Sequence, residues 1–275
     1  MKYIIKKLLT LILTLFFISV LVFLIFQVIP GDPALSILGT EATEEQVEAL
    51  REQLGLNDSM PERYFNWFTG VLTGDLGRSY RYQESLNEQM EVSRLIAGKL
   101  QVTLTLAGLS LLLIIMFSIP IGILWGGTKS RFIDGALNVL SQFTMSVPSF
   151  FLGIIIIYLF GLIMRWFTPG GYISYKEDFR GYIRYMLFPA ITVALPKAAM
   201  TAKFLRNSII TQLKSDYVRT AYSKGARRMR VLFVHVLRNA MIPVVTFIGV
   251  IAAEIAAGSI VVEQVFGLPG RSEEH

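Results

Sequence analysis

Residues 215–230 read SDYVRTAYSKGARRMR, a basic segment with one glycine that lies between two apolar runs. The apolar residues of the chain gather in runs of about 20, the length that crosses a hydrocarbon core as a helix. Of the 275 residues, 53% are hydrophobic and 17% are charged, whereas about a quarter are charged in soluble domains. The sequence therefore predicts an all-α integral membrane protein.

About five spans are expected. The first is an N-terminal anchor within 1–29, and the others lie at about 101–124, 135–164, 186–202 and 240–262. A retained anchor is favoured over a cleaved signal peptide because its apolar run is about 22 residues long and no small-residue cleavage site follows it. Residues 30–99 are expected to form an extracytoplasmic helical segment, 100–270 a core with a cytoplasmic loop at 203–239, and 271–275 a short tail.

The charges predict one orientation. Lysines 2, 6 and 7 place the N-terminus in the cytoplasm under the positive-inside rule. Counting crossings then places 203–238 inside, where nine Lys or Arg face one acid, and 31–98 outside, where twelve acids face five Arg. The net charge of +6 thus fits orientation in a lipid membrane, and no nucleic-acid partner is expected. The absence of cysteine excludes disulfides and thiolate metal sites.

The outer segment contains helix signals. Thr43 followed by acidic residues is typical of a helix start, and Gly55 is a suitable end. A second short helix is expected from Pro61 onward. Either these helices form a cap that packs on the outer mouth, or they form a docking surface or gate; the two interpretations are compatible.

Four of the expected spans contain proline, which ends or kinks a helix. These prolines favour a transporter or channel over a rigid anchor, because freed backbone carbonyls in lipid need protein or water nearby. They are Pro120, Pro148, Pro189, Pro196 and Pro243.

The basic segment also has the signals of a short helix. Ser215 or Asp216 can cap its start by accepting a backbone N–H bond, and Gly225 can end it in the left-handed conformation. So short a helix needs a partner to be stable. A stripe at helical spacing would supply the contact: Val218, Ala221 and Tyr222. The loop is either a short helix that another protein binds and uses to move the spans, or a basic surface that attracts anionic lipid.

The stretch DYVRTAYSKGARRMRVLFVHVLRNAMIPVV, 216–245, resembles the cytoplasmic EAA loop of permease subunits in binding-protein-dependent ABC importers. Further motifs are similar to the peptide and nickel branch of that family: VIPGDP, GDLGRSY, SVPSFFLG and VVEQVFGLPG. Together they cover about 1–270, and the chain looks most like the first, B-type, of the two permease subunits. The resemblance implies the type I ABC importer transmembrane fold.

What the resemblance implies for partners is specific. A second homologous permease would complete the pathway, two cytoplasmic ATPase subunits would bind the EAA loops, and an extracytoplasmic protein would deliver the substrate. The helix from Asp216 to Lys224 would couple ATP hydrolysis to movement of the spans. Arg219, Thr220 and Ala221 stand where the general family has Glu-Ala-Ala, so the glutamate is absent. The implied ATPase-coupling residues are Asp216, Tyr217, Arg219, Thr220, Ala221, Lys224 and Gly225.

The chain lacks the Gly-x-x-x-x-Gly-Lys-Ser/Thr loop that binds ATP phosphates. We therefore expect no enzyme activity, no catalytic residue and no cofactor in this chain, with ATP and magnesium on the partner ATPases. The expected function is ATP-driven import of short peptides across a bacterial or archaeal cytoplasmic membrane. The alternatives are import of nickel or a metal chelate and, third, an ion-driven secondary transporter.

At the end of the sequence, five residues, RSEEH, follow FGLPG, where the family continues into a last span. On this ground the family's last span is expected to be missing, either by truncation or because the gene ends early.

Two carboxylates and one histidine remain. Glu254 is expected near the middle of the fifth span, where it either lines the transport pathway or is a protonated or paired structural group. Glu263, nine residues later, is expected on the opposite face of the same helix, fastening its outer end. His235 has no ligand partner at a suitable spacing, so no metal site is expected.

Overall fold

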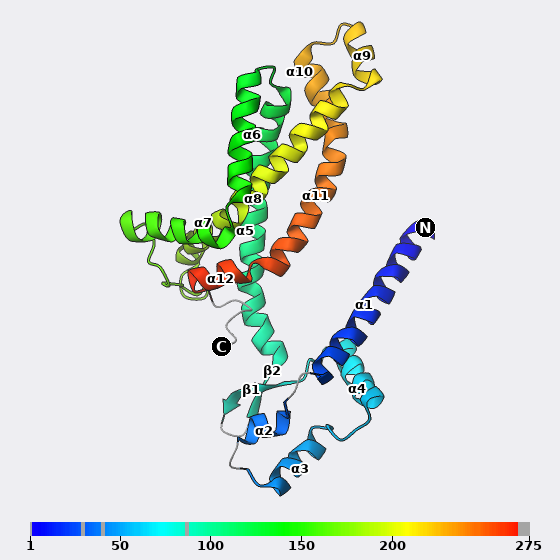
Figure 1. Cartoon of the computed structure of the whole chain (residues 1–275), viewed down its shortest axis with the longest axis vertical. Coiled ribbons are helices and arrows are strands. Elements are labelled where there is room, and N and C mark those ends of the chain that lie inside the picture. The colour runs from blue at the N-terminus through cyan, green and yellow to red at the C-terminus, as the bar shows by residue number, and fades with distance from the viewer. Residues whose placement is uncertain (1, 29–30, 40–41, 86–87, 269–275) are drawn as a thin grey trace. The chain divides into compact units, whose positions relative to one another are not determined.

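The computed structural model describes residues 2–28, 31–39, 42–85 and 88–268, and the chain divides into two compact units, 1–97 and 98–275. Helices dominate both units (Figure 1). The first unit contains α1 (Lys2–Val28), α2 (Pro33–Leu38), α3 (Glu44–Gln53), α4 (Met60–Thr73), β1 (Arg78–Ser85), β2 (Glu88–Glu91) and the start of α5 (Val92–Gly127). The second unit continues α5 and contains α6 (Arg131–Ser146), α7 (Ser149–Ile156), η1 (Ile157–Ile163), α8 (Phe179–Leu213), α9 (Asp216–Ser223), α10 (Arg228–Arg230), η2 (Val231–Val236), α11 (Leu237–Gly258) and α12 (Ile260–Phe266).

The two helices expected in the outer segment are present. Thr43 begins α3 with a capping box, in which its hydroxyl accepts from the Gln46 N–H at 3.4 Å while the Gln46 side chain accepts from the Thr43 N–H at 3.0 Å. Gly55 follows the helix with φ +65°, in the left-handed region that favours glycine. Both ends of α3 are thus confirmed, and α4 covers the second helix predicted from Pro61.

Within the first unit, α4 packs on α1 through aromatic side chains. Tyr64 lies edge-on to Phe23 with ring centroids 5.3 Å apart, and its hydroxyl is 2.8 Å from that of Ser19. No residue of α1 is buried within this chain, and the helix is apolar on every side. A helix that is apolar all round requires lipid or further protein around it.

A pair of strands in the first unit was not predicted, because 30–99 was expected to be helical. β1 and β2 are antiparallel, with Arg78 opposite Glu91 and Ser85 opposite Glu88. Register shifts interrupt the ladder. Because β1 is rich in charged and polar residues, it lacks the apolar alternation by which a strand is recognised in a sequence.

Among the described residues, four helical segments are long and apolar enough to cross a membrane: α1, α5, α8 and the continuous helix Arg228–Ala257. The expected span at 135–164 is not a single rod, because α6 and the helix formed by α7 with η1 meet at an angle of 93°. Val147 and Pro148 lie at this bend, where proline cannot continue the hydrogen-bond ladder of α6. The prolines at 120, 189, 196 and 243 lie inside continuous helices.

The second unit is organised around α8, which packs against α6, α7, α11 and α12. One buried cluster, which includes Leu106, Ile114, Met186 and Phe266, joins α5, α8 and α12. The Tyr185 hydroxyl donates to the Phe266 carbonyl at 2.6 Å and fastens α12 to α8. A second cluster lies near the end of α8 that leads into α9, and Figure 1 shows α9 and α10 together at that end.

Candidate functional site: the loop between α8 and α11

The segment between α8 and α11 contains the helix predicted from the basic stretch. α9 runs from Asp216 to Ser223 and follows Ser215, whose backbone is extended (φ −75°, ψ 149°). The Ser215 side chain makes no capping hydrogen bond, so the predicted side-chain cap is wrong in this respect. Its carbonyl instead accepts from the Val218 N–H at 3.1 Å, which forms the first turn.

Gly225 ends α9 as predicted. Its φ of +80° lies in the left-handed region, its N–H donates to the Tyr222 carbonyl at 2.9 Å, and the Ala226 N–H donates to the Ala221 carbonyl at 3.1 Å. These two bonds form a Schellman motif, which satisfies carbonyls that a helix end would otherwise leave unpaired. A Cβ added at Gly225 would meet no atom within 4 Å, so the backbone conformation, and not crowding, is what requires glycine here.

Val218 anchors α9 to the rest of the unit. Its side chain is 1% exposed and belongs to the second buried cluster, which we call the anchor cluster. The anchor cluster draws residues from three elements besides α9: Leu205 and Ile209 of α8, Val231, Leu232 and Val236 of η2, and Ala240 and Val244 of α11. Ala221 and Ala226 pack against it from outside. One apolar side chain thus joins α9 to both flanking helices.

The opposite side of α9 is exposed and polar. The side chains of Asp216 and Arg219 are 98% and 82% exposed and lie 3.8 Å apart. Thr220, Tyr222 and Lys224 are exposed as well. Tyr222 therefore does not complete the predicted apolar stripe. Although Tyr222 lies four residues after Val218, it is 45% exposed, whereas Val218 and Ala221 pack in or against the anchor cluster.

The predicted coupling residues thus fall into two groups. Ala221 packs inward, where a small side chain lets α9 approach the bundle closely. The Tyr217 hydroxyl donates to the Gln212 side chain at 2.8 Å, so this residue ties α9 to the end of α8. The remaining five lie on the accessible side or at its end: Asp216, Arg219, Thr220, Lys224 and Gly225.

Beside the loop, an ion pair that the sequence analysis missed joins α6 to α8. The Arg206 guanidinium donates to both carboxylate oxygens of Asp134, at 2.6 and 2.7 Å. The Trp125 indole N–H donates to the same carboxylate at 2.7 Å, and its ring lies 5.6 Å from the guanidinium carbon. Asp134 and Arg206 lie beside the expected spans at 135–164 and 186–202, so two opposite charges were visible, but the sequence does not show which charges pair.

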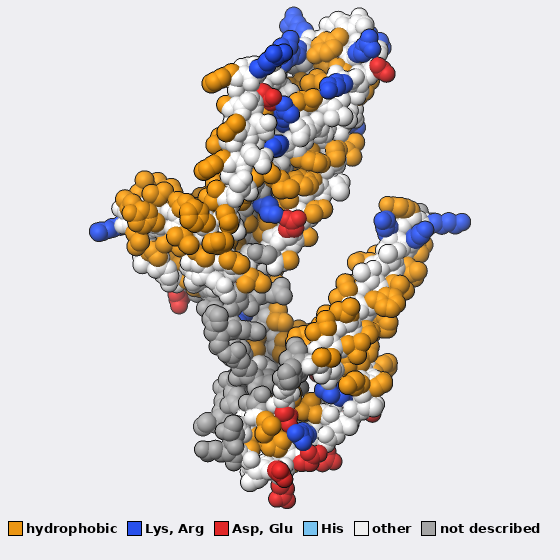
Figure 2. Space-filling view, viewed as in Figure 1, with side chains coloured by type: hydrophobic (Ala, Val, Ile, Leu, Met, Phe, Trp, Pro, Cys, Tyr) orange, Lys and Arg blue, Asp and Glu red, His pale blue; other side chains and the backbone are white. Residues whose placement is uncertain are grey.

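Close packing of α5 on α8 brings these elements together. A Cβ added at Gly122 or Gly126 would lie 2.9 Å from a side-chain atom of Leu205 or Ile209, respectively. Arg228 donates to the Gly127 carbonyl, which connects the end of α5 to the start of α10. Figure 2 shows basic side chains gathered at this end of the second unit, while the long helices below it are mainly hydrophobic.

Glu254 is paired with a lysine that the sequence analysis did not single out. Lys197 of α8 donates to the Glu254 carboxylate of α11. The two side chains are 31% and 53% exposed, so the pair lies at a surface of the isolated chain. A lysine inside an apolar span was the signal that could have found this partner, because such residues are rare and usually functional.

Glu263 lies outside the helix that carries Glu254, contrary to the prediction. The helix is interrupted at Ser259, and Figure 1 shows α12 turned away from the axis of α11. Glu263 is fully buried and accepts from the hydroxyls of Thr103, at 3.0 Å, and Ser259, at 2.8 Å. It therefore fastens α12 to α5. Because Glu254 and Glu263 lie in different helices, the prediction that they occupy opposite faces of one helix is wrong.

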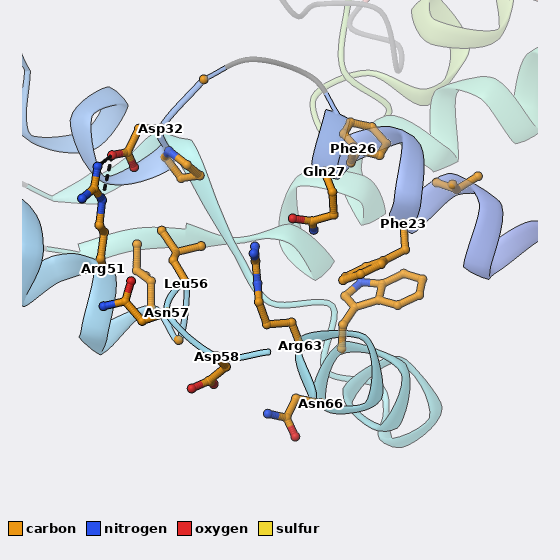
Figure 3. Close-up of a pocket in the computed structure, with 16 residues that line it drawn as sticks. Phe23, Phe26, Gln27, Asp32, Arg51, Leu56, Asn57, Asp58, Arg63 and Asn66 are labelled. Atoms are coloured by element: carbon orange, nitrogen blue, oxygen red, sulfur yellow. Dashed lines mark hydrogen bonds and ion pairs between the residues drawn. The ribbon is translucent and has the colours of Figure 1, made fainter. Parts of the chain in front are cut away.

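The first unit contains a cavity of about 1050 Å³ lined by α1, α4 and the segment between them. Figure 3 shows Gln27 and Arg63 extending into this space and Asp32 paired with Arg51 at its edge. The Arg51 side chain donates to Asp32, at 2.9 Å from its Nε, and holds the pKa of that carboxyl below its usual value. Asp32 also caps α2 by accepting from the Ala34 N–H at 2.9 Å.

Metal ligands are not grouped in the described part of the chain. No three His, Cys, Asp or Glu side chains there lie close enough together to hold a metal ion. His235 lies within η2 and is partly buried.

Comparison with known proteins identifies the family. Residues 118–273 match the binding-protein-dependent transport system inner membrane component, and 1–107 match the N-terminal region of such membrane components. The chain belongs to this family. It is therefore a multi-pass membrane permease of an ABC transport system with the type I importer transmembrane fold, a class that works with ATPase and substrate-binding subunits.

Three relatives illustrate the similarity of this permease to known proteins. It is 34% identical to a probable peptide ABC transporter permease protein of Sinorhizobium fredii, over 98% of this chain and 84% of the relative. It is 35% identical to a putative peptide transport system permease protein of Brucella abortus, over 92% and 79%. It is 36% identical to a glutathione transport system permease protein of Escherichia coli, over 98% and 84%.

Proposed function

We propose that this permease imports short peptides and that α9 couples it to cytoplasmic ATPase subunits. The observation that carries the coupling proposal is the two-sided character of α9. Its buried Val218 is held by side chains from both α8 and α11, while Arg219, Thr220 and Lys224 remain exposed. A helix attached in this way transmits a displacement of its outer surface to the two helices beside it.

The loop 203–239 and the N-terminus are proposed to lie in the cytoplasm. Nine basic residues against one acid in 203–238, and three lysines before the apolar part of α1, support this orientation. Segment 31–98, with its excess of acids, then lies outside, where a substrate-binding protein can reach it.

The proposed assembly has one second permease, two ATPases and one external binding protein. The sequence lacks a phosphate-binding loop of the Gly-x-x-x-x-Gly-Lys-Ser/Thr type, which supports placing ATP and its magnesium on the partner subunits. In this assembly, Arg219 pairs with an acidic groove on an ATPase, and Gly225 permits close approach because it has no side chain.

The substrate class is proposed from the relatives. Two of them are named for peptide transport and one for glutathione, which is itself a tripeptide. Short peptides with free ends are therefore the substrates proposed for this permease. Glu254 is proposed to line their pathway, because its side chain stays accessible although the part of α11 around it is apolar.

Co-purification tests the coupling proposal. Tagged permease should recover the ATPase subunits, whereas Gly225→Asp and Arg219→Glu should lose them. Both changes are at exposed positions, and aspartate tolerates the left-handed conformation better than most residues, so the fold should persist. Lys176→Glu, an exposed charge reversal in the segment between η1 and α8, is the control and should retain the ATPases.

Uptake tests the transport proposal. Proteoliposomes with the full assembly, binding protein outside and ATP inside should accumulate labelled di- and tripeptides. Uptake driven by an ion gradient in the absence of ATPases, or uptake of nickel in place of peptides, would contradict the proposal. Modification of Lys224→Cys by a membrane-impermeant reagent added outside would contradict the orientation.

A further inference from the structure

The paired charges on α8 and α11 carry an inference about how substrate is held. We propose that Lys197 and Glu254 form a binding site for the two charged ends of a short peptide, with Glu254 taking the ammonium group and Lys197 the carboxylate. This assignment rests on the proposed function and adds to it the residues that select zwitterionic substrates.

The position of the pair indicates contact with water and not with lipid. Lys197 lies in the middle of α8, well away from either end of a helix that is long enough to cross the membrane. Placing a charged side chain in the hydrocarbon core is costly, and such residues usually face a protein interior or a water-filled path. More than half of the Glu254 side chain is nevertheless exposed in this chain. A path shared with the second permease satisfies both conditions.

The pair is not needed to hold α8 against α11. Ile251 and Ile255 of α11 are buried in the first cluster, and the Ser208 hydroxyl of α8 donates to the Ala240 carbonyl at 2.9 Å. Phe204 and Phe247 stack between the same two helices with centroids 4.5 Å apart. Ion pairs with this degree of exposure add little stability, so a structural role alone does not explain two charges at this place.

The stacked phenylalanines also define the shape of the site. Phe204 is seven residues after Lys197, and Phe247 is seven residues before Glu254. Because seven residues make about two helical turns, each phenylalanine lies on the same side of its helix as the charge, about 10 Å nearer to α9. The surface therefore has a charged pair followed by an apolar pair, which matches a molecule with charged ends and variable side chains.

Charge balance favours replacing the ion pair between Lys197 and Glu254 with ion pairs to the substrate. In the empty site the lysine and the glutamate neutralise each other. When a zwitterion enters, one internal ion pair is replaced by two pairs with the substrate, and the total charge stays zero. A peptide blocked at either end would leave one protein charge without a partner, and that unpaired charge is what the site selects against.

Cysteine accessibility tests the location, since the chain has no native cysteine. Glu254→Cys is compared with Val245→Cys, which is also exposed but lies nine residues away and therefore on the opposite side of α11. In the assembled transporter, a cationic methanethiosulfonate reagent should modify the cysteine at 254, more slowly when binding protein and dipeptide are present. The cysteine at 245 should stay unmodified. An unreactive 254, or equal reaction at both positions, would overturn the assignment.

Uptake ratios test the chemistry. Glu254→Gln should lower uptake of a free dipeptide about tenfold relative to its N-acetylated form. Lys197→Met should lower uptake of the free dipeptide about tenfold relative to the dipeptide with a C-terminal amide. Each ratio is compared with that of the unaltered transporter and the same binding protein, so the selectivity of that protein cancels. The double variant with Lys197→Met and Glu254→Leu replaces the two charges with apolar side chains and keeps helix packing. In it, the preference for a free amino group and the preference for a free carboxylate should both be lost. Unaltered ratios in that double variant would show a merely structural pair.

Failure of the proposed substrate class and failure of the assignment of Lys197 and Glu254 give different results. If the unaltered transporter imports no peptide, the proposed substrate class is overturned and this assignment with it. If it imports peptides and the variants leave both ratios unchanged, only the assignment is overturned.

Discussion

Val218→Ala should release α9 from the anchor cluster without unfolding the membrane helices. The valine is 1% exposed, and the change removes two methyl groups from a buried position. At about 0.8 kcal/mol for each carbon, together with a contribution from the cavity left behind, the loss is about 2 kcal/mol. Since α9 has eight residues and is too short to be stable alone, the lost free energy weakens its docking in the anchor cluster. A change of 2 kcal/mol shifts the ratio of docked to released helix by a factor of about 30.

Hydrogen–deuterium exchange measures this ratio at the amides that close α9. The N–H groups of Lys224, Gly225 and Ala226 are bonded within the helix end, so they exchange when α9 opens. Their protection should fall about 30-fold in Val218→Ala. Val234→Ala removes the same two methyl groups from a side chain that is 55% exposed and should change protection little. Unaltered protection in Val218→Ala would refute the view that this residue anchors the helix, as would an equal fall in both variants.

Three further changes give separate expectations. Gly126→Ala places a Cβ 2.9 Å from the Ile209 side chain and should destabilise the α5–α8 contact by about 1–3 kcal/mol, measured by thermal unfolding in detergent. Gly225→Ala forces alanine into a left-handed conformation and should weaken the end of α9 by about 1–2 kcal/mol, measured by amide exchange. Arg51→Gln removes the donors that lower the pKa of Asp32, and carbon NMR of labelled aspartate should show that pKa rising. Because the folded pKa lies below the ordinary value of 3.8, the pair stabilises the α2–α3 region at neutral pH, and this contribution disappears as pH falls through the folded value.

Each of these has a contrasting control. A Cβ at Gly135 meets no atom within 4 Å, so Gly135→Ala should leave α6 as stable or slightly more so, and destabilisation there would undermine the packing argument. Gly225→Asn should weaken α9 less than alanine does, since asparagine tolerates the left-handed region. For Asp32, a pKa that does not respond to Arg51→Gln would show that the arginine is not its cause.

The sequence was sufficient for features whose signals are local. The start of α3 at Thr43, the end of α9 at Gly225 and the burial of Val218 all follow from capping chemistry or from the order of polar and apolar residues within one helix. The family motifs are likewise contiguous stretches. The sequence therefore predicts the membrane class and the short helix of the basic loop before any tertiary contact is known.

Features that depend on pairing across the chain could not be predicted. Lys197 is 57 residues from Glu254, and Asp134 is 72 residues from Arg206. The Thr103 hydroxyl donates to Glu263, 160 residues away, whereas the Thr105 hydroxyl donates to the Gln101 carbonyl of its own helix. Periodicity shows which side of a helix is apolar but not which charged side chains meet.

The anchor cluster and the paired charges lie along the same two helices. Ile209 is twelve residues from Lys197 along α8, and Val244 is ten residues from Glu254 along α11, separations of about 18 and 15 Å. If a partner displaces α9 alone, the burial of Val218 is lost at about 2 kcal/mol. If α8 and α11 move with it, that burial is kept, and so is the stacking of Phe204 on Phe247. A joint movement of α8, α9 and α11 therefore keeps contacts that displacement of α9 alone would break, and it carries Lys197 and Glu254 together without separating them.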